Sequence, residues 1–326
     1  MNYVITGGCG FIGSHLAHSL IYSGHKIVVI DDLSSGCIEN IEDLLSNPDF
    51  TLIENDILSI KNWDTILSPH DVIIHLAATV GVNNVIKNPL QTLNNNYQPT
   101  LQLIKIALQY KCKFFFSSTS EIYGELNTDF SCETDSFFVP GSLCGRSAYV
   151  LGKILSEQYC MEYSRQFGLP VVIGRFFNII GPNQVDKFGM VVPTFIRQAA
   201  NNEPITLYGN GDQTRVFCDI SDLISAVKLL LKEPRAFGEI FNIGGNERIT
   251  IKELGHYIKE NLNSSAPLVS IPFPPHRRED RDVLHRSACL KKIQSLTGWE
   301  PTTNWQDAVD SIIAHQIIFA SQSNFK

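Results

Sequence analysis

Tyr149 and Lys153 are the residues whose types and spacing point most directly to chemistry. A separation of four residues places both side chains on one face of a helix. A phenol with an ordinary pKa of about 10 is a poor base at neutral pH, but a neighbouring ammonium favours its phenolate. The pair therefore indicates proton transfer from a substrate hydroxyl, although tyrosine and lysine four apart also occur on inert helices.

A hydroxyl-rich segment supplies further candidates. The apolar run 114–116 leads into the polar residues 117–121, which predicts a strand that opens into a loop. Ligands of open parallel sheets bind beyond such carboxyl ends. Thr119 is placed to relay a proton between a substrate hydroxyl and Tyr149, and Glu121 to act at a neighbouring carbon. A Ser/Thr-rich turn is the plainer interpretation of the same residues.

A glycine loop lies between the first predicted strand and the first predicted helix, with Gly7, Gly10 and Gly13 as its members. The first two permit backbone geometry and close approach that a Cβ would block, and Gly13 allows the helix to pack tightly on the strand. Exposed amide groups at the helix N-terminus favour a pyrophosphate. The loop therefore predicts a dinucleotide site.

Two carboxylates, Asp31 and Asp32, end the next predicted strand. They follow the glycine loop by roughly 20 residues, where a carboxylate can accept hydrogen bonds from a ribose diol. We assign this role to Asp31, whose charge disfavours a 2′-phosphate, so that NAD is predicted rather than NADP. A simple turn cap before residues 34–36 is the alternative. Asp56 and Ile57, after the third strand, are placed to contact the adenine.

The elements that position these residues follow from the hydrophobic pattern. Short apolar runs alternate with amphipathic segments through the first third of the chain, which predicts a parallel sheet covered on both faces. We therefore predict an α/β fold: a doubly wound Rossmann sheet in 1–175, with return segments near 215–245, and a smaller, interleaved C-terminal lobe in 176–326. The expected strands are 3–5, 27–30, 51–53, 72–76, 114–117, 171–175 and 239–243, and the expected helices lie near 13–23, 94–110 and 148–167.

Composition limits the classes of function. The 326 residues, 44% hydrophobic and 18% charged, can bury a substantial core without disulfides or a structural metal. A formal charge of −7 argues against nucleic-acid partners. The eight cysteines form no CxxC pair, the N-terminus lacks the features of a signal peptide, and the longest apolar stretch falls short of a membrane helix. We expect a cytoplasmic protein without membrane partners.

Together these motifs resemble the extended short-chain dehydrogenase/reductase family, and the resemblance covers nearly the whole chain. It is carried by the glycine loop, the Tyr149/Lys153 pair, and the runs 31–36, 75–78, 118–124 and 175–182. Such NAD-dependent epimerases, dehydratases and decarboxylases share a 4-keto sugar intermediate. The resemblance implies a catalytic set of Tyr149, Lys153 and Thr119, with Glu121 beside it. The candidate cofactor contacts are Gly7, Gly10, Phe11, Ile12, Gly13, Asp31, Asp32, Ser35, Gly36, Asp56, Ile57, Leu76, Ala77, Ala78, Asn96, Ser117, Tyr149, Lys153 and Phe176.

The resemblance also implies how a nucleotide sugar binds, mainly to the lobe 176–326. Asn178 and two arginines would hold the diphosphate, since a guanidinium suits phosphate oxygens and a tyrosine face suits stacking on uracil. Each arginine equally suits a surface salt bridge. The candidate substrate contacts are Thr119, Ser120, Asn178, Val192, Leu207, Tyr208, Arg215 and Arg278.

The type of reaction is expected to depend on Glu121. After oxidation at C4, return of hydride to the other face gives epimerisation, loss of the C5 proton leads to elimination, and loss of a C6 carboxylate is decarboxylation. The sequence Thr-Ser-Glu at 119–121 resembles decarboxylases and GDP-mannose dehydratases, but residues 79–82 and 98–99 depart from the decarboxylase pattern. We rank a UDP-hexose 4-epimerase first, a dehydratase or UDP-glucuronate decarboxylase next, and a non-catalytic NAD(H)-binding redox sensor last.

The helices near 94–110 and 148–167 carry apolar residues beyond one narrow stripe. The resemblance implies that they form a four-helix homodimer interface, although a buried core within one subunit would give a similar pattern. The residues concerned are Leu101, Ile104, Leu108, Leu151, Leu155 and Tyr159.

Overall fold

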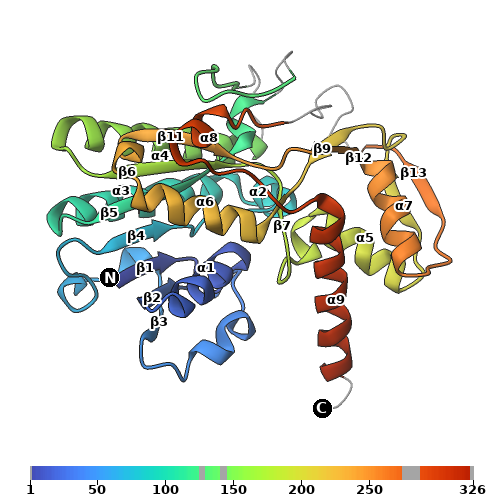
Figure 1. Ribbon diagram of the computed structural model, residues 1–326, viewed down its shortest axis with the longest axis horizontal. Helices are drawn as coiled ribbons and strands as arrows, with labels where there is room; N and C mark the ends of the chain where they lie inside the picture. Colours follow the sequence, from blue (N-terminus) through green and yellow to red (C-terminus); the bar gives the residue numbers. More distant parts are fainter. Residues whose placement is uncertain (1, 125–128, 140–144, 274–286, 324–326) are drawn as a thin grey trace.

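The computed structural model describes residues 2–124, 129–139, 145–273 and 287–323. Its centre is a seven-stranded sheet in the order β11-β6-β5-β4-β1-β2-β3 (Figure 1). Every pairing in this sheet is parallel, which confirms the predicted doubly wound α/β fold. The strands are β1 (Asn2–Thr6), β2 (Lys26–Asp31), β3 (Phe50–Glu54), β4 (Val72–His75), β5 (Lys113–Thr119), β6 (Val171–Phe176) and β11 (Glu239–Ile243).

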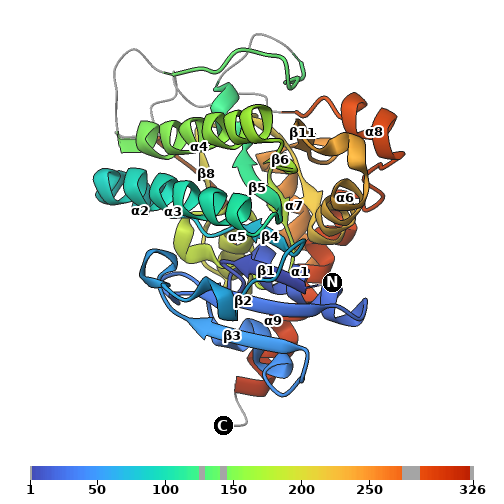
Figure 2. The same ribbon diagram turned by 90° about the vertical axis from the view of Figure 1, so that its left-hand side faces the viewer.

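Alternating side chains bury both faces of the sheet. On β5, Phe114 and Phe116 pack into the core on one face and Phe115 into the core on the other, and all three are fully buried. Truncation of one such ring to alanine typically costs about 3–5 kcal/mol. Helices α3 (Pro89–Gln109) and α4 (Gly145–Phe167) cover the first face, and α1 (Phe11–Tyr22) and α6 (Ile220–Lys232) cover the second (Figure 2).

The C-terminal lobe has a separate core, formed by side chains of α5, α7, α9 and the strand β8. Helix α7 begins with a capping box, in which Thr250 and Glu253 each accept a hydrogen bond from the other's backbone N–H. The chain returns to the main sheet as β11 before it enters the strand β12, so the two parts are interleaved. The remaining helices and strands are α2 (Val82–Lys87), β7 (Ile179–Ile180), α5 (Val191–Ala200), β8 (Ile205–Tyr208), β9 (Thr214–Val216), β10 (Cys218–Asp219), β12 (Arg248–Thr250), α7 (Ile251–Asn261), β13 (Leu268–Ile271), α8 (Lys291–Thr297) and α9 (Trp305–Ser323).

The predicted strands of the main sheet all appear, with ends that differ by two residues at most. Helix α3 begins five residues before the predicted start, because Pro89 occupies the first turn, where its missing N–H costs nothing. Pro99 lies inside the same helix. Within the described residues, no helix combines the length and the apolar character needed to cross a bilayer.

Candidate active site

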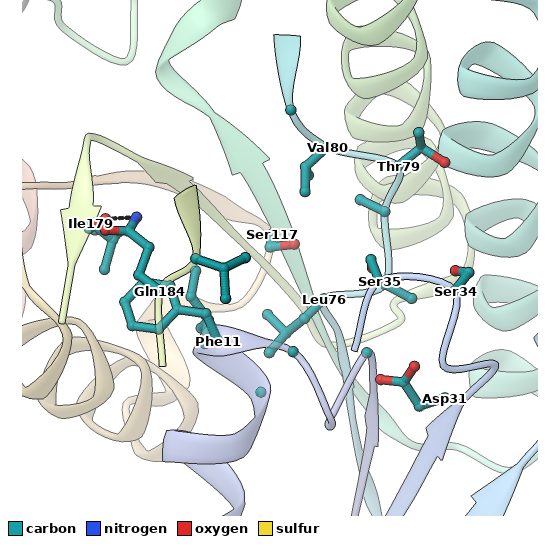
Figure 3. A pocket seen from close by; sticks show the side chains of 18 of the residues that line it. Phe11, Asp31, Ser34, Ser35, Leu76, Thr79, Val80, Ser117, Ile179 and Gln184 are labelled. Carbon is teal, nitrogen blue, oxygen red and sulfur yellow. Dashed lines mark hydrogen bonds between the residues drawn. The ribbon is translucent and has the colours of Figure 1, made fainter. Parts of the chain in front are cut away.

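A cavity of about 1790 Å³ opens at the carboxyl ends of β1, β2, β4, β5 and β6. The strand order reverses between β1 and β4, and ligands of doubly wound sheets bind at such a point. Figure 3 shows side chains from several of these strand ends turned toward one space, among them Phe11, Asp31, Leu76, Thr79 and Ser117. Most of the predicted site residues in the first 178 positions therefore meet in one cavity.

The glycine loop forms one wall of this cavity. Gly7 has a positive φ of 72°, and a Cβ on it would lie 2.8 Å from the backbone nitrogen of Ala77. A Cβ on Gly13 would lie 2.2 Å from the carbonyl oxygen of Gly7. The loop therefore depends on these two glycines, and it leaves the start of α1 facing the cavity, as pyrophosphate binding by NAD requires.

Asp31 joins the end of β2 to the glycine loop. Its two carboxylate oxygens accept hydrogen bonds from the backbone N–H groups of Cys9 and Leu33, each at 2.9 Å. Burial raises the pKa of Asp31, and these two hydrogen bonds oppose the shift. A Cβ on Gly36 would lie 3.0 Å from both carboxylate oxygens, so glycine permits the turn to approach them. A carboxylate accepts about four hydrogen bonds, and Asp31 therefore retains capacity for a ribose diol. The residues present fit NAD.

Lys153 and Tyr149 lie on the cavity side of α4, as the four-residue spacing predicts. The Lys153 ammonium is 3% exposed and donates a hydrogen bond of 2.7 Å to the carbonyl oxygen of Ser117. Burial lowers the pKa of Lys153 to about 8, and the charge of Glu157 partly opposes this shift. The ammonium is therefore fixed against the end of β5.

Burial, a neighbouring charge and a hydrogen bond shift the pKa of Tyr149 in the absence of a cofactor. Burial and then the charge of Glu121 raise the pKa of Tyr149, whereas a hydrogen bond with Thr119 lowers it. The protein alone thus holds Tyr149 as a neutral phenol, because desolvation of a phenolate outweighs the stabilising contacts. Thr119 also caps the short helix η4 (Ser120–Tyr123) by accepting a hydrogen bond of 3.2 Å from the Glu121 N–H. Tyr149, Thr119 and Glu121 therefore interact directly at one point of the cavity.

Two of the predicted contacts, Asn96 and Asn178, form hydrogen bonds that hold loops around the cavity. Asn96 does not line the cavity, but its side chain accepts from the Thr79 N–H at 2.7 Å and donates to the Thr79 carbonyl at 3.1 Å. It thereby fixes the loop after β4, which does line the cavity. Asn178 lines the cavity with φ of 42° and donates a hydrogen bond of 2.9 Å to the carbonyl oxygen of Val216.

Unlike Asn178, four predicted substrate contacts of the lobe, Val192, Leu207, Tyr208 and Arg215, do not line this cavity. Val192 and Leu207 are buried in the core of the lobe. Tyr208 stacks on Phe273 with a centroid separation of 5.7 Å. Arg215 lies on β9, opposite Ile249 of β12. Arg278 lies outside the described residues.

The cavity also has walls that the sequence did not indicate. His15 and His18 of α1 contribute to it, and so do Ile312 and His315 of α9, which is distant in sequence. His15 forms a hydrogen bond of 2.9 Å with the carbonyl oxygen of Pro182. The spacing of His15 and His18 after the glycine loop could have suggested their position, whereas nothing local in α9 could. No group of three or more potential metal ligands occurs in the part of the chain that the structure describes.

His75 explains one further motif, the run at 75–78. Its ring lies between two threonines, with Nδ1 at 2.7 Å from the Thr6 hydroxyl and Nε2 at 3.0 Å from the Thr100 hydroxyl. Complete burial lowers the pKa of His75 to about 3, so the ring is neutral. It holds the ends of β1 and β4 together beside the glycine loop.

The fold and this cavity define a class of protein. The model of the NAD dependent epimerase/dehydratase family matches residues 3–244, and the chain belongs to this family. It is accordingly an NAD-dependent enzyme that acts on nucleotide sugars, as the motifs predict, and the non-catalytic sensor is set aside.

Two enzymes of named activity and one solved structure illustrate the similarity of this chain to other members of the family. The chain is 34% identical to a UDP-N-acetyl-alpha-D-glucosaminuronate decarboxylase of Bacillus cytotoxicus, over 95% of this chain and 96% of the relative. It is 33% identical to UDP-glucuronic acid decarboxylase 1 of Arabidopsis thaliana, over 96% of this chain and 69% of the relative. The structure of UDP-glucuronic acid 4-epimerase from Bacillus cereus, in complex with UDP-glucuronic acid and NAD, superimposes with a TM-score of 0.87 at 29% identity, covering 98% of this chain and 100% of that one.

Proposed function

We propose that this enzyme decarboxylates a UDP-linked uronic acid by way of a 4-keto intermediate. The carrying observation is the position of Glu121, which lines the cavity with Thr119 and Tyr149 and whose charge raises the pKa of Tyr149. Oxidation and return of hydride at C4 require a tyrosine and a relay, but not a carboxyl group. Glu121 therefore indicates chemistry at a carbon next to C4. The similarity to UDP-uronate decarboxylases supports this choice over the epimerase that the sequence alone ranks first.

The proposed reaction balances without an external reductant. Bound NAD would supply the acceptor for the C4 hydride, and its positive charge would favour the phenolate of Tyr149. The proton of the C4 hydroxyl passes to Tyr149 through Thr119. The C5–C6 bond then breaks, carbon dioxide leaves, and its electron pair enters the enolate between C5 and C4. A proton is added at C5, the hydride returns to C4, and Tyr149 returns the hydroxyl proton.

Each residue has a distinct part in this scheme. Lys153, fixed to the Ser117 carbonyl, supplies a positive charge to the cavity. Glu121 takes up a proton from solvent and donates it to C5, a role open to it because it lines the cavity with the Tyr149 phenol. We further propose that Asn178 and the lobe residues Val192, Leu207, Tyr208, Arg215 and Arg278 bind the UDP group.

A UDP-sugar 4-epimerase is the second candidate. The structure of a UDP-glucose 4-epimerase from Thermotoga maritima, solved with UDP-glucose, superimposes with a TM-score of 0.86 at 28% identity. Residues 79–82 also depart from the decarboxylase pattern, and Thr79 and Val80 line the cavity. Epimerisation shares the oxidation step but returns hydride to the opposite face, and no carbon is lost.

Product analysis distinguishes these reactions. The purified enzyme is incubated with UDP-glucuronic acid, UDP-N-acetylglucosaminuronic acid and UDP-glucose, together with GDP- and dTDP-sugars, without added reductant. We expect NMR to show a UDP-pentose or its N-acetylated counterpart, with release of carbon dioxide from the uronic acids. Conversion of UDP-glucuronic acid to its C4 epimer, with all carbons retained, would overturn the proposal in favour of the epimerase.

Replacement of Glu121 by Gln gives a sharper test. We expect turnover of the uronic acid to fall about 100-fold, because general acid catalysis typically contributes this much, while NADH still forms in the first step. Glu260→Gln is the matched control, the same exchange at an exposed position of the lobe outside the cavity lining, and should remain within about threefold. A Glu121→Gln enzyme with full turnover would exclude the assigned role of this carboxyl group.

We also infer that the enzyme is a cytoplasmic homodimer that pairs through α3 and α4. Ile104 is fully buried within the subunit, but Leu155 is 40% and Leu90 78% exposed on these helices. The Tyr97 and Tyr159 rings lie 5.5 Å apart between them. Light scattering at micromolar concentration should give the mass of a dimer, and a monomer would contradict the inference.

A further inference from the structure

Arg175 is a cation buried in the middle of the fold. It lies on β6, is 1% exposed, and is surrounded on its strand by apolar residues. Burial of a guanidinium costs free energy unless its N–H groups have hydrogen-bond partners. The partners of Arg175 therefore indicate the role of this residue. Its side-chain partners lie on two different segments that carry catalytic candidates, and its Nη1 also donates to the carbonyl oxygen of Glu133 at 3.2 Å.

The first partner is Glu157 on the catalytic helix α4. Nε and Nη2 of Arg175 donate to the two carboxylate oxygens of Glu157 at 3.0 and 2.7 Å. Glu157 is 2% exposed. It follows Lys153 by four residues and Tyr149 by eight, so the three side chains succeed one another along one face of α4. The ion pair thus fixes α4 one turn beyond its catalytic lysine.

The second partner is Tyr123, the last residue of η4. Nη1 of Arg175 donates to the Tyr123 hydroxyl at 2.7 Å, and the guanidinium lies 5.0 Å from the centroid of the same ring. The Tyr123 hydroxyl in turn donates to Asn242 of β11 at 2.7 Å. Since η4 follows Thr119 directly and contains Glu121, this contact fixes the other half of the catalytic set.

We propose that Arg175 is a positioning residue, which holds the Tyr149 and Lys153 helix at a fixed distance from the turn that carries Thr119 and Glu121. More than 20 residues separate η4 from α4, so the local chain does not set their separation. The rigid planar fork of a guanidinium can fix two neighbours at once, which an ammonium cannot. The Tyr149–Thr119 hydrogen bond requires such precision, and a 1 Å error in a catalytic arrangement can cost about 100-fold in rate. The kinetic tests of this inference rest on the proposed function, because they use its substrate. The positioning of α4 and η4 by Arg175 does not depend on it.

The principal test replaces the ion pair by apolar side chains, Arg175→Met with Glu157→Met. Buried ion pairs can often be exchanged for apolar residues without loss of folding, and no unpaired charge remains. We expect a folded protein that binds NAD, with kcat lowered about 100-fold and KM changed less than about threefold. The control is Arg165→Met with Glu162→Met, which removes an exposed ion pair of 2.8 Å from the same helix and should leave kcat unchanged.

Single variants cover the case in which the double variant does not fold. Tyr123→Phe retains the ring beneath the guanidinium and removes only the hydroxyl link to η4. Arg175→Lys retains the charge and removes the fork. We expect each to lower kcat about tenfold at nearly constant KM. Folded variants with kcat within twofold of the unaltered enzyme would overturn the proposal.

A crystal structure of the double variant, or of Tyr123→Phe if the former does not fold, separates this inference from the proposed function. We expect η4 to be displaced from α4 and the Tyr149–Thr119 hydrogen bond to be lost. An unchanged hydrogen bond would overturn the positioning role, whatever reaction the enzyme catalyses. Failure of the unaltered enzyme to decarboxylate both UDP-glucuronic acid and UDP-N-acetylglucosaminuronic acid would instead overturn only the proposed function.

Discussion

At the carboxyl edge of the sheet, the residues that the sequence motifs predict line the cavity. In the C-terminal lobe, most of the predicted residues that the structure describes do not. Glycine loop, Asp31, Thr119, Tyr149 and Lys153 come from four separate stretches of the chain, yet all line one cavity. Leu207 and Tyr208 of the lobe do not. Parallel strands bring their carboxyl ends together whatever the length of the connections, so a motif at a strand end is already placed. The lobe combines helices α5, α7 and α9 with short strand pairs, whose position depends on contacts distant in sequence.

The largest effect is expected from the sheet edge, for Tyr149→Phe. Loss of the phenol removes the acceptor of the C4 hydroxyl proton, and turnover should fall about 1000-fold. NAD should remain bound, since the glycine loop and Asp31 are untouched. Turnover by NMR and the NAD content of the denatured protein check both parts. Tyr163→Phe, on the same helix but outside the cavity lining, is the control, and equal losses in the two variants would contradict the assignment.

The sequence predicts the positions of residues better than their protonation states and their partners. Helical spacing correctly places Tyr149 and Lys153 on one face, because a helix repeats the same local geometry. The spacing indicates that the Lys153 ammonium favours the phenolate, but it does not indicate that burial raises the pKa of Tyr149 in the folded chain. Burial is a property of the whole fold, and the pattern of four residues does not contain it. The same holds for Arg175, which belongs to a recognisable motif but whose partners only the fold brings to it.

A smaller effect at the sheet edge is expected for Asp31→Asn. One charged acceptor for the ribose diol is lost, and hydrogen bonds to charged groups contribute about 1.5–3 kcal/mol, so the Kd of NAD should rise about 10- to 100-fold. Discrimination against NADP should weaken as well. Calorimetric titration with NAD and with NADP measures both Kd values. Asp49→Asn is the control, because Asp49 is exposed and does not line the cavity, and the Kd of NAD for this variant should change less than about threefold.

The buried ammonium of Lys153 should make the reaction depend on pH. Its pKa is lowered to about 8, so it is charged below that pH and neutral above it. If the charge is needed in the cavity, kcat/KM should fall as pH rises through about 8, by about tenfold for each further pH unit. Lys153→Arg should remove this fall, because a guanidinium stays charged to far higher pH. A profile that stays flat to pH 10 in the unaltered enzyme would show that the charge is not required.

The smallest effect is expected in the lobe, for Tyr208→Ala. Stacking of a base on an aromatic ring contributes about 1–3 kcal/mol, and we take the lower end because Tyr208 already stacks on Phe273. KM for the UDP-sugar should therefore rise about fivefold, whereas kcat should stay within twofold, since the ring is outside the cavity that contains Tyr149. Tyr257→Ala is the control, because it breaks another aromatic pair of the lobe, with Trp305 at 4.8 Å. A fall in kcat as large as that for Tyr149→Phe would contradict the assignment of catalysis to the carboxyl edge of the sheet and of substrate binding to the lobe.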